Sequence, residues 1–593
     1  MSEALLSVED LSVGYAGRDV VRAAGFSVAR GRCLGVIGES GAGKSQAFLA
    51  LLGLLPDSAA VRGGARFDDS QLPRDALKLR GRRIGMIFQD PMTALTPHLT
   101  IGEQIAESLV AHRDASWRDA RARAAELLAR VGMSDVPRRL GQYPHELSGG
   151  MRQRAMIACA LACDPELLIA DEPTTALDVS VQAQILALLR QLVDAGTALV
   201  VITHDMGVIA ALADDVAVMR AGVVVEQGPA ARLLSAPMHE YTRTLLAATP
   251  RLETPTPLFP ALEAGTPPLV ANHVSVVHEL RGGWRKRTLT AVDDVSLEVA
   301  AGDALGIVGE SGCGKSSLAR AVLRLAPAGG EIVWLGRPVQ ALVGDALRVE
   351  RAGVQIVFQD PLASLDPVMT VAEVVAEPLR ALRPALDSTA RGARVLKMLA
   401  AVGLGPEFAQ RRGRELSGGQ CQRVAIARAM ALAPKLLVCD EAVSALDVSI
   451  QAQVLALLAG LQRTEGTAIV FVSHDLAVVR QLCRRVLVMY LGRVVESGLT
   501  AEVLSRPRHP YTRMLLEAVP RLNPVEARAR LSSAVFHSTI RGEAPSALER
   551  PTGCAFRSRC PSAEDRCAVT SPGTERIEDS HEVACLRWRE LPN

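Results

Sequence analysis

The chain has 593 residues, of which 66 are basic and 64 acidic, giving a formal net charge of +2. This balance argues against a broad nucleic-acid-binding face, and the length predicts several domains of ordinary size. The sequence has no signal peptide and no charge-free run of 18 apolar residues, so we expect a cytoplasmic protein that does not itself span a membrane.

Five short motifs occur twice, in the same order, about 270 residues apart. One glycine-rich match could be accidental, but five ordered matches at a nearly constant offset predict two copies of a nucleotide-hydrolysing domain. The pairs are Gly38-Glu-Ser-Gly-Ala-Gly-Lys-Ser45 with Gly309-Glu-Ser-Gly-Cys-Gly-Lys-Ser316, Phe88-Gln-Asp-Pro91 with Phe358-Gln-Asp-Pro361, Leu147-Ser-Gly-Gly150 with Leu416-Ser-Gly-Gly419, Asp171-Glu172 with Asp440-Glu441, and His204-Asp205 with His474-Asp475.

The repeat divides the chain. We expect a first domain over 1–252, a linker with five prolines over 253–268, a second domain over 269–522 and a separate C-terminal segment over 523–593. The end of the first domain, around Tyr241-Thr242-Arg243, returns at Tyr511-Thr512-Arg513 near the end of the second.

Each copy begins with an apolar strand, a glycine-rich loop and a predicted helix, over 45–55 or 316–325. Apolar residues at three-to-four spacing then predict helices over 117–131 and 389–402. Four apolar runs predict strands buried on both faces, as in parallel sheets. These runs cover 167–170, 198–203, 436–439 and 468–473. We therefore expect an α/β fold with a parallel core and an inserted helical subdomain.

The glycine-rich loops suit phosphate binding because their backbone N–H groups can turn toward an anion at a helix N-terminus. The residues concerned are Gly38, Ser40, Gly41 and Gly43 in the first copy and Gly309, Ser311, Gly312 and Gly314 in the second. Only six of the 66 basic residues are lysine, and two of them are Lys44 and Lys315. This usage indicates a site that needs a compact ammonium, which we expect to reach the β- and γ-phosphates of ATP.

The remaining motifs supply the groups that hydrolysis needs. We expect the hydroxyls of Ser45 and Ser316 to bind Mg²⁺ and Asp171 and Asp440 to hold the waters of the metal. The next residues, Glu172 and Glu441, are candidates to polarise the attacking water. His204 and His474 follow further apolar strands and are placed to contact the γ-phosphate.

The Leu-Ser-Gly-Gly elements make residues 5–522 similar to the ABC transporter ATPases. The resemblance implies two tandem P-loop NTPase cassettes, each with a RecA-like α/β core and a helical subdomain. In this family two cassettes pack head to tail, and each ATP site joins one P-loop to the signature of the other cassette. It implies that ATP at Lys44 is capped by Ser417, Gly418, Gly419 and Gln420, and ATP at Lys315 by Ser148, Gly149, Gly150 and Met151.

The same resemblance makes Gln89 and Gln359 the glutamines that sense Mg²⁺. The segments that follow them, and the Tyr-Thr-Arg endings, resemble importers of oligopeptides, dipeptides, glutathione and nickel. The resemblance implies an ATPase subunit of an importer, peripheral at the cytoplasmic face of the inner membrane, with two transmembrane permease subunits, a substrate-binding protein and no nucleic acid as partner. Short peptides are the expected solute, and glutathione, nickel or a metallophore remain alternatives.

Three positions depart from the pattern of the family. The first signature has Met151 where glutamine is usual, and Ala442 stands where proline normally follows the glutamate. Tyr15 matches the aromatic residue that stacks on adenine, but the corresponding residue of the second copy is His278, with Trp284 as another candidate. Since neither Met151 nor Ala442 removes a reacting group, we expect two competent sites, with unequal rates possible.

Four cysteines lie within 32 residues of the C-terminal segment: Cys554, Cys560, Cys567 and Cys585. Their spacing does not match a paired zinc ribbon, and disulfides are disfavoured in the cytosol. The segment resembles the C-terminal element of peptide-importer ATPases, in some of which four thiolates hold a [4Fe–4S] cluster. Zinc and the absence of a metal remain open.

Two other classes of function compete with transport. A soluble tandem ATPase acting on ribosomes or nucleic acid would usually carry a long charged linker or large zinc-bearing insertions, and this chain has neither. A purely regulatory nucleotide-binding protein conflicts with the two intact sets of acidic and histidine residues.

Overall fold

The computed structural model describes residues 4–175, 177–254, 259, 265–282, 285–443, 446–540, 542, 545–548, 550–578 and 580–591. The chain divides into two compact units. One contains Met1–Thr249, Asp447–Ser449 and Ala518–Gly542, and the other contains Pro250–Leu446, Ile450–Glu517 and Glu543–Asn593. No helix in the described ranges is both long and apolar enough to cross a membrane.

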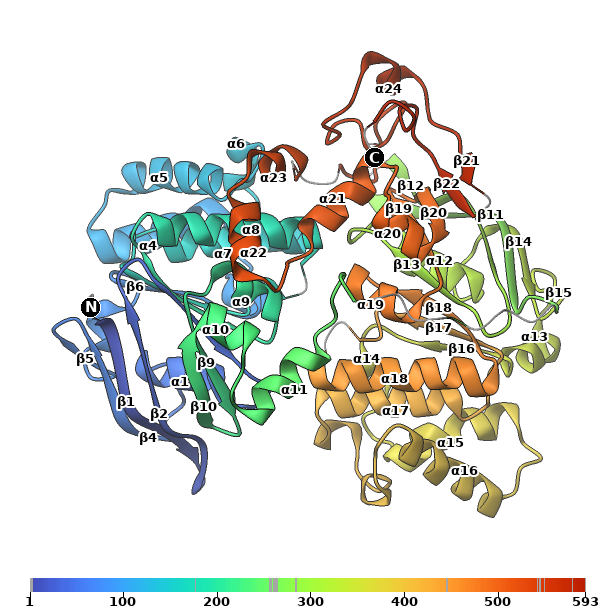
Figure 1. Ribbon diagram of the computed structural model, residues 1–593, viewed down its shortest axis with the longest axis horizontal. Coiled ribbons are helices and arrows are strands. Elements are labelled where there is room, and N and C mark those ends of the chain that lie inside the picture. Colours follow the sequence, from blue (N-terminus) through green and yellow to red (C-terminus); the bar gives the residue numbers. More distant parts are fainter. Residues whose placement is uncertain are drawn as a thin grey trace. The chain divides into compact units, whose positions relative to one another are not determined.

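Each cassette combines an antiparallel sheet, a largely parallel sheet and a group of helices (Figure 1). In the first cassette the strands are β1 (Ala4–Tyr15), β2 (Arg18–Ala29), β3 (Cys33–Ile37), β4 (Ala59–Phe67), β5 (Ser70–Leu72), β6 (Ile84–Ile87), β7 (Leu167–Asp171), β8 (Ala198–Thr203), β9 (Asp215–Arg220) and β10 (Val223–Pro229). Its helices are α1 (Lys44–Leu51), α2 (Ala76–Leu79), α3 (Pro91–Ala94), α4 (Ile101–Arg113), α5 (Trp117–Arg130), α6 (Val136–Leu140), α7 (Gly149–Leu161), α8 (Val179–Asp194), α9 (Met206–Leu212), α10 (Ala230–Ser235) and α11 (Glu240–Ala248).

The second cassette repeats this order. Its strands are β11 (Leu269–Gly282), β12 (Arg285–Val299), β13 (Ala304–Val308), β14 (Gly329–Trp334), β15 (Arg337–Pro338), β16 (Val354–Val357), β17 (Leu436–Asp440), β18 (Ala468–Val472), β19 (Arg485–Tyr490) and β20 (Arg493–Leu499). Its helices are α12 (Lys315–Val322), α13 (Gly344–Arg351), α14 (Pro361–Ser364), α15 (Val371–Leu382), α16 (Ser388–Ala401), α17 (Gly418–Met430), α18 (Val448–Glu465), α19 (Leu476–Leu482), α20 (Thr500–Ser505) and α21 (Pro510–Ala518).

The expected parallel core is confirmed in both cassettes. The first has the strand order β10-β9-β3-β8-β7-β6, in which β3 lies parallel between β8 and β9. The carboxyl ends of these strands meet at one edge, where open α/β sheets bind ligands. The antiparallel sheets, β2-β1-β4-β5 and β12-β11-β14-β15, were not expected from the sequence.

The core of the first cassette lies around α1, which packs between the two sheets. Phe48 on α1 is fully buried, and its ring centroid lies 5.1 Å from that of Phe26 on β2. The helix was expected to reach Leu55 but ends at Leu51, because Gly53 takes a φ of +61° and turns the chain. Burial of this helix on both sides fixes the loop that precedes it.

The helical subdomains are α4 to α7 and α15 to α17. In both, a capping box starts the first long helix: Thr100 with Glu103 and Thr370 with Glu373 exchange side-chain and backbone hydrogen bonds. The expected helices over 117–131 and 389–402 are confirmed as α5 and α16, with ends that differ by one residue.

The segment expected over 523–593 is divided between the two units. Its helices α22 (Pro524–Leu531) and α23 (Ala534–Thr539) group with the first unit, where α22 lies against α9. Arg528 of α22 pairs with the carboxylate of Asp214 at 3.0 Å. The rest, with α24 (Asp565–Val569), β21 (Glu575–Glu578) and β22 (His581–Val583), extends the parallel sheet of the second cassette through β20.

Trp334 of β14 lies in the core of the second cassette and contacts the C-terminal end of α12. Its side chain is fully buried, and its indole N–H donates to the Val322 carbonyl at the end of α12 (2.8 Å). We expect Trp334→Ala to lower the free energy of unfolding of the second unit by about 3–5 kcal/mol, since it leaves a large cavity. Calorimetry of the full chain measures this change. Trp117→Ala, at a side chain 51% exposed on α5, is the matched control and should leave both transitions in place.

Candidate functional site

The lysine of each glycine-rich loop is buried and held by the loop itself. Lys44 Nζ donates to the carbonyls of Gly38 (2.7 Å) and Glu39 (2.9 Å), and Lys315 Nζ donates to those of Gly309 (2.7 Å) and Glu310 (3.0 Å). Burial lowers the pKa of Lys44, although neighbouring carboxylates act in the opposite direction. Each loop therefore already curls around a desolvated ammonium.

Two glycines explain why the loop tolerates no larger residue just before the lysine. Gly43 has a φ of +91° and Gly314 a φ of +106°, which side-chain-bearing residues rarely adopt. A Cβ at either position would also collide with a backbone oxygen, of Val20 or Ala291. The glycines thus let the loop close over the start of α1 and α12.

The serine after each lysine lies beside the aspartate at the end of the neighbouring strand. Ser45 Oγ donates to Asp171 Oδ1 (2.9 Å), and Ser316 Oγ donates to Asp440 Oδ1 (2.8 Å). Burial raises the pKa of both carboxyls. In the described part of the chain, the second oxygen of Asp440 is buried without a hydrogen-bond partner. A hydrated cation beside these oxygens would satisfy it.

The glutamates that follow have histidine and glutamine neighbours. In the first cassette, Gln89 Nε2 donates to Glu172 (3.0 Å), and His204 Nδ1 lies 3.3 Å from the same carboxylate. Burial raises the pKa of Glu172, but the hydrogen bond and charge of His204 outweigh it and bring the pKa to about 2. Burial lowers the pKa of His204, whereas Glu172 raises it and prevails.

The second cassette repeats this group, with a longer distance between the histidine and the glutamate. Gln359 Nε2 donates to Glu441 at 2.8 Å, while His474 Nδ1 lies 3.9 Å from the carboxylate. His474 lowers the pKa of Glu441 against the opposite effect of burial. Both glutamates have a positive φ, +46° and +49°, in the region that non-glycine residues seldom occupy. Such strain is typical of positions where a side chain must face a reaction site.

A cavity of about 340 Å³ opens beside the loop of the second cassette. Its walls include His278, Gly312, Lys315, Ser316, Gln359 and Glu441. This volume lies within the range of small-ligand sites. His278 therefore faces the same cavity as the loop, and Trp284 lies outside the described residues. In the first cassette the Tyr15 hydroxyl donates to Gln46, two residues after Lys44 (2.6 Å).

The Leu-Ser-Gly-Gly elements lie on the helical subdomains, where they start α7 and α17. Ser148 accepts from the Met151 N–H and Ser417 from the Gln420 N–H, both at 3.3 Å. The Gln420 side-chain oxygen in turn accepts from the Ser417 N–H (3.0 Å), which completes a capping box. The methionine at position 151 has no side-chain acceptor for this second bond. Gly149, Gly150, Gly418 and Gly419 form the first turns of the two helices.

Some contacts of the site were not foreseen. Thr175 Oγ1 donates to Glu172 (3.0 Å), and the Glu39 and Glu310 N–H groups donate to the hydroxyls of Tyr241 (3.1 Å) and Tyr511 (2.8 Å). The repeat of Tyr-Thr-Arg at the same offset was a signal for the tyrosines, but it was interpreted only as a mark of subfamily.

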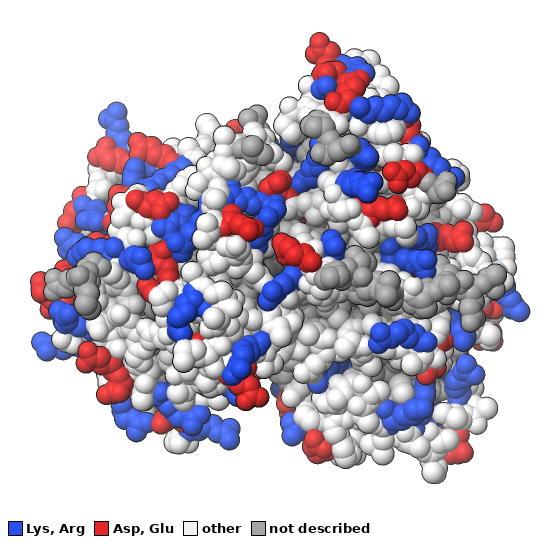
Figure 2. Space-filling model, viewed as in Figure 1, with Lys and Arg blue, Asp and Glu red and all other residues white. Residues whose placement is uncertain are grey.

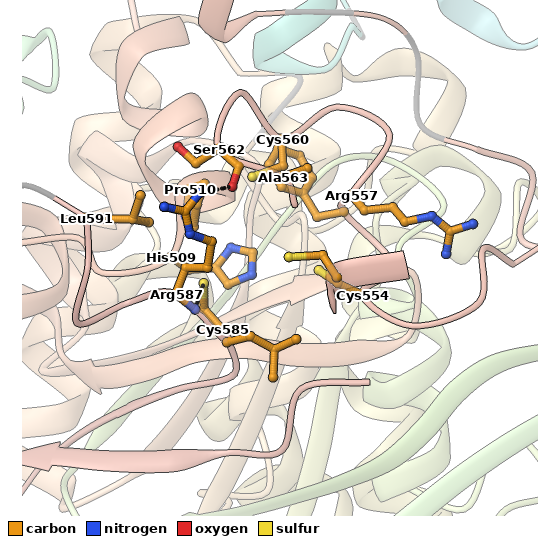
Figure 3. Close-up of a pocket in the computed structure, with 13 residues that line it drawn as sticks. His509, Pro510, Cys554, Arg557, Cys560, Ser562, Ala563, Cys585, Arg587 and Leu591 are labelled. Atoms are coloured by element: carbon orange, nitrogen blue, oxygen red, sulfur yellow. Dashed lines mark hydrogen bonds between the residues drawn. The ribbon is translucent and has the colours of Figure 1, made fainter. Parts of the chain in front are cut away.

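The four C-terminal cysteines line one cavity of about 20 Å³, room for roughly one water molecule (Figure 3). His509 borders it as well, and burial lowers its pKa to about 4. Burial raises the pKa of Cys560 to about 11 and also raises those of Cys554 and Cys585. Within the described ranges no three Cys, His, Asp or Glu side chains converge as a metal site.

Comparisons with known proteins agree with this arrangement. A model of the ABC transporter family matches residues 21–175 and 292–444, and one of the oligopeptide/dipeptide transporter C-terminal region matches 225–274 and 495–567. The glutathione import ATP-binding proteins GsiA of Escherichia coli (strain K12) and Shigella dysenteriae are each 44% identical over 568 residues, covering 88% of this chain and 91% of theirs.

Among solved structures, a dimeric bacterial ABC transporter cassette, MJ0796, aligns with 30% identity and a TM-score of 0.37 over 39% of this chain and 98% of its own. The ABC transporter model covers just over half of the 593 residues, in two copies that each contain a glycine-rich loop, a Leu-Ser-Gly-Gly element and an Asp-Glu pair. By this match and the 44% identity to its relatives, the chain belongs to the ABC transporter family.

Proposed function

We propose that the chain is the ATP-hydrolysing subunit of an importer that takes up short peptides or peptide-like solutes, glutathione among them. The observation that carries the proposal is a repeated arrangement, in which a buried loop lysine lies near a Ser–Asp pair and a Glu–His pair, in a chain 44% identical to glutathione import ATP-binding proteins. The match to the oligopeptide/dipeptide C-terminal region supports the same class of solute. Neither the family models nor the relatives favour action on ribosomes.

Each loop is proposed to hold the phosphates of ATP through its backbone N–H groups and its lysine. Lys44 and Lys315 would exchange their carbonyl partners for phosphate oxygens without leaving the loop. The oxygen donors of Ser45, Gln89, Ser316 and Gln359 suit Mg²⁺, and the buried unpartnered oxygen of Asp440 fits its hydration shell. When bound, Mg²⁺ neutralises charge that develops on the β- and γ-phosphates.

Glu172 and Glu441 are proposed to orient and polarise the attacking water. A carboxylate can do this only while it is ionised, and His204 keeps the pKa of Glu172 far below neutral pH. His204 and His474, which follow β8 and β18, can donate a hydrogen bond to the γ-phosphate. The shorter distance in the first cassette, 3.3 Å against 3.9 Å, is a basis for unequal turnover.

We also propose that the sites are composite, as in the family. The N-termini of α7 and α17 present backbone N–H groups that could close over a γ-phosphate bound at the other P-loop. ATP would then hold the cassettes together, and hydrolysis would release them. We further propose that the chain divides at residues 252, 268 and 522 into a first cassette, a linker, a second cassette and a C-terminal segment.

The proposed partners are two transmembrane permeases and a substrate-binding protein, with the chain bound at the cytoplasmic face of the inner membrane. On the face shown in Figure 2, basic and acidic side chains of the described residues are interspersed. The described residues of this face therefore form no broad basic patch of the kind that binds nucleic acid.

The test begins with purification of the tagged chain from detergent-solubilised membranes and mass spectrometry of the proteins that accompany it. We expect two permeases. Reconstituted with them and their binding protein, the chain should drive ATP-dependent uptake of glutathione or dipeptides, with nickel as the alternative. Recovery of ribosomal proteins in place of permeases would contradict the proposal.

Replacement of the catalytic glutamates provides a second prediction. Glu172→Gln and Glu441→Gln should retain ATP binding while the double variant loses at least about a hundredfold in turnover, since water activation is lost at both sites. Phosphate release and equilibrium nucleotide binding measure the two effects. Glu240→Gln, at an exposed position of α11, is the control. Unchanged turnover in the double variant would rule out these roles.

The cysteine cavity is a proposed site for a thiolate-bound metal group, either a [4Fe–4S] cluster or zinc. Four thiols on one cavity provide a donor set that suits both, although among the described residues no three such side chains converge as a metal site. Cys554, Cys560, Cys567 and Cys585 would be the ligands, and the group would tie the segment together.

Metal analysis and visible absorption of protein purified without oxygen test this assignment. We expect iron with sulfide and a broad visible band for a cluster, or about one zinc per chain. Cys560→Ser should remove the metal, whereas Cys159→Ser in α7 of the first cassette should not. A metal-free chain with four reactive thiols would refute the site.

A further inference from the structure

A buried ion pair joins the cysteine-bearing segment to the P-loop of the second cassette. Arg559 Nη1 and Nη2 donate to the two carboxylate oxygens of Glu310 at 2.5 and 2.8 Å, although the residues are 249 positions apart. Their side chains are 3% and 4% exposed. A bidentate contact of this kind fixes both the position and the orientation of the carboxylate. Either charge alone would be costly to bury.

Glu310 is itself part of the phosphate-binding loop. It follows Gly309, its carbonyl accepts from Lys315 (3.0 Å), and its N–H donates to Tyr511 (2.8 Å). The side chain held by Arg559 and the carbonyl held by the lysine belong to the same residue. A shift of the Glu310 side chain would therefore also move the Glu310 carbonyl, which accepts the hydrogen bond from Lys315.

Backbone hydrogen bonds hold the turn that carries Arg559. The Arg559 N–H and the Cys560 N–H both donate to the Phe556 carbonyl at 3.0 Å, in a tight turn beside the cysteine cavity. The Phe556 ring is buried, with its centroid 5.3 Å from those of Tyr490 and Tyr511.

The segment also continues the sheet of the second cassette. β22 pairs with β20, and His581 Nε2 lies 2.8 Å from the buried carboxylate of Glu496. Figure 1 shows β22 and β21 at the edge of the sheet next to β20. The segment that carries Arg559 is thus part of the second cassette.

The first cassette supports its loop differently. The Glu39 N–H still donates to a tyrosine, Tyr241, but the residue at the position of Tyr490 is Arg220, whose guanidinium lies 5.0 Å from the centre of the Tyr241 ring. Among the ion pairs of the described residues none includes Glu39, whose carboxylate accepts instead from the Ser449 hydroxyl (2.7 Å). The two loops share their internal contacts and differ in what holds the glutamate from outside.

We propose that Arg559 is a positioning residue of the second ATP site: by holding Glu310 it sets the shape of the loop around Lys315 and the affinity of that site for ATP. The second site then depends on the cysteine-bearing segment, and the first does not. This inference rests on the proposed role of residues 309–316 in binding ATP.

The test measures ATP binding at each cassette separately in the full chain. Azido-ATP is photo-crosslinked at rising concentrations on ice, and labelled peptides from each cassette are quantified. In Arg559→Met we expect the half-saturating concentration of the second cassette to rise about tenfold, the scale of one lost charge-assisted contact, and that of the first to change less than about twofold. Arg559→Lys, which keeps the charge, should lie between.

Arg566→Met is the matched control, because Arg566 lies in the same segment and its ion pairs with Glu564 and Glu590 are exposed. It should alter neither cassette. Arg559→Met leaves the Glu310 carboxylate buried without this partner, so the double variant Arg559→Met/Glu310→Gln provides a neutral pair that avoids this cost. Thermal unfolding verifies that each variant is folded.

If Arg559 acts by positioning Glu310, the double variant should still weaken labelling of the second cassette, but no more than the more affected single variant does. Unchanged labelling of the second cassette in a folded Arg559→Met or double variant overturns the proposal, as does an equal loss at both cassettes. Lys315→Ala distinguishes failure of the proposed role of Arg559 from failure of the proposed ATP site. If it too leaves labelling of the second cassette unchanged, the assignment of the ATP site fails, and not merely the role of Arg559.

Discussion

The structure of each site depends on keeping one lysine ammonium out of water. Lys44 and Lys315 are 6% and 4% exposed, and the compensation for their lost hydration comes from two carbonyls of the loop that precedes each of them. Those carbonyls can converge only because glycines with positive φ turn the chain. The helices that follow are immobilised because they are buried against the sheets of their cassettes. The shape of each loop is therefore set by contacts within its own cassette.

The two copies carry the same candidate site residues but differ in the contacts around them. The first signature helix lacks the reciprocal cap that Gln420 gives the second, and the histidine lies closer to the glutamate in the first cassette. Repetition of motifs therefore conserves the chemistry while the surroundings of each site diverge. Such divergence offers a fused chain a way to assign different duties to its two ATP sites.

Much of the site could be predicted because its demands are local. A glycine loop between a strand and a helix, or an acidic pair at the end of an apolar run, carries its own backbone requirements and can be recognised within ten residues. The antiparallel sheets were missed because strands such as β1 and β2 contain register shifts that interrupt the alternation of buried and exposed residues. The contact of Arg559 with Glu310 joins residues 249 apart, and no local pattern encodes such a pairing.

The grouping of α22 with the first unit has a consequence for how the protein is made. Arg528 donates to the Ala213 carbonyl across 315 residues of sequence and pairs with Asp214, which Arg32 and Arg190 also approach. At roughly 5–20 residues per second, translation of 315 residues takes about 15 to 60 s. During that time the first cassette has emerged from the ribosome with one side still uncovered. The face of the first cassette that α22 covers is therefore completed only when residues 524–531 have been synthesised.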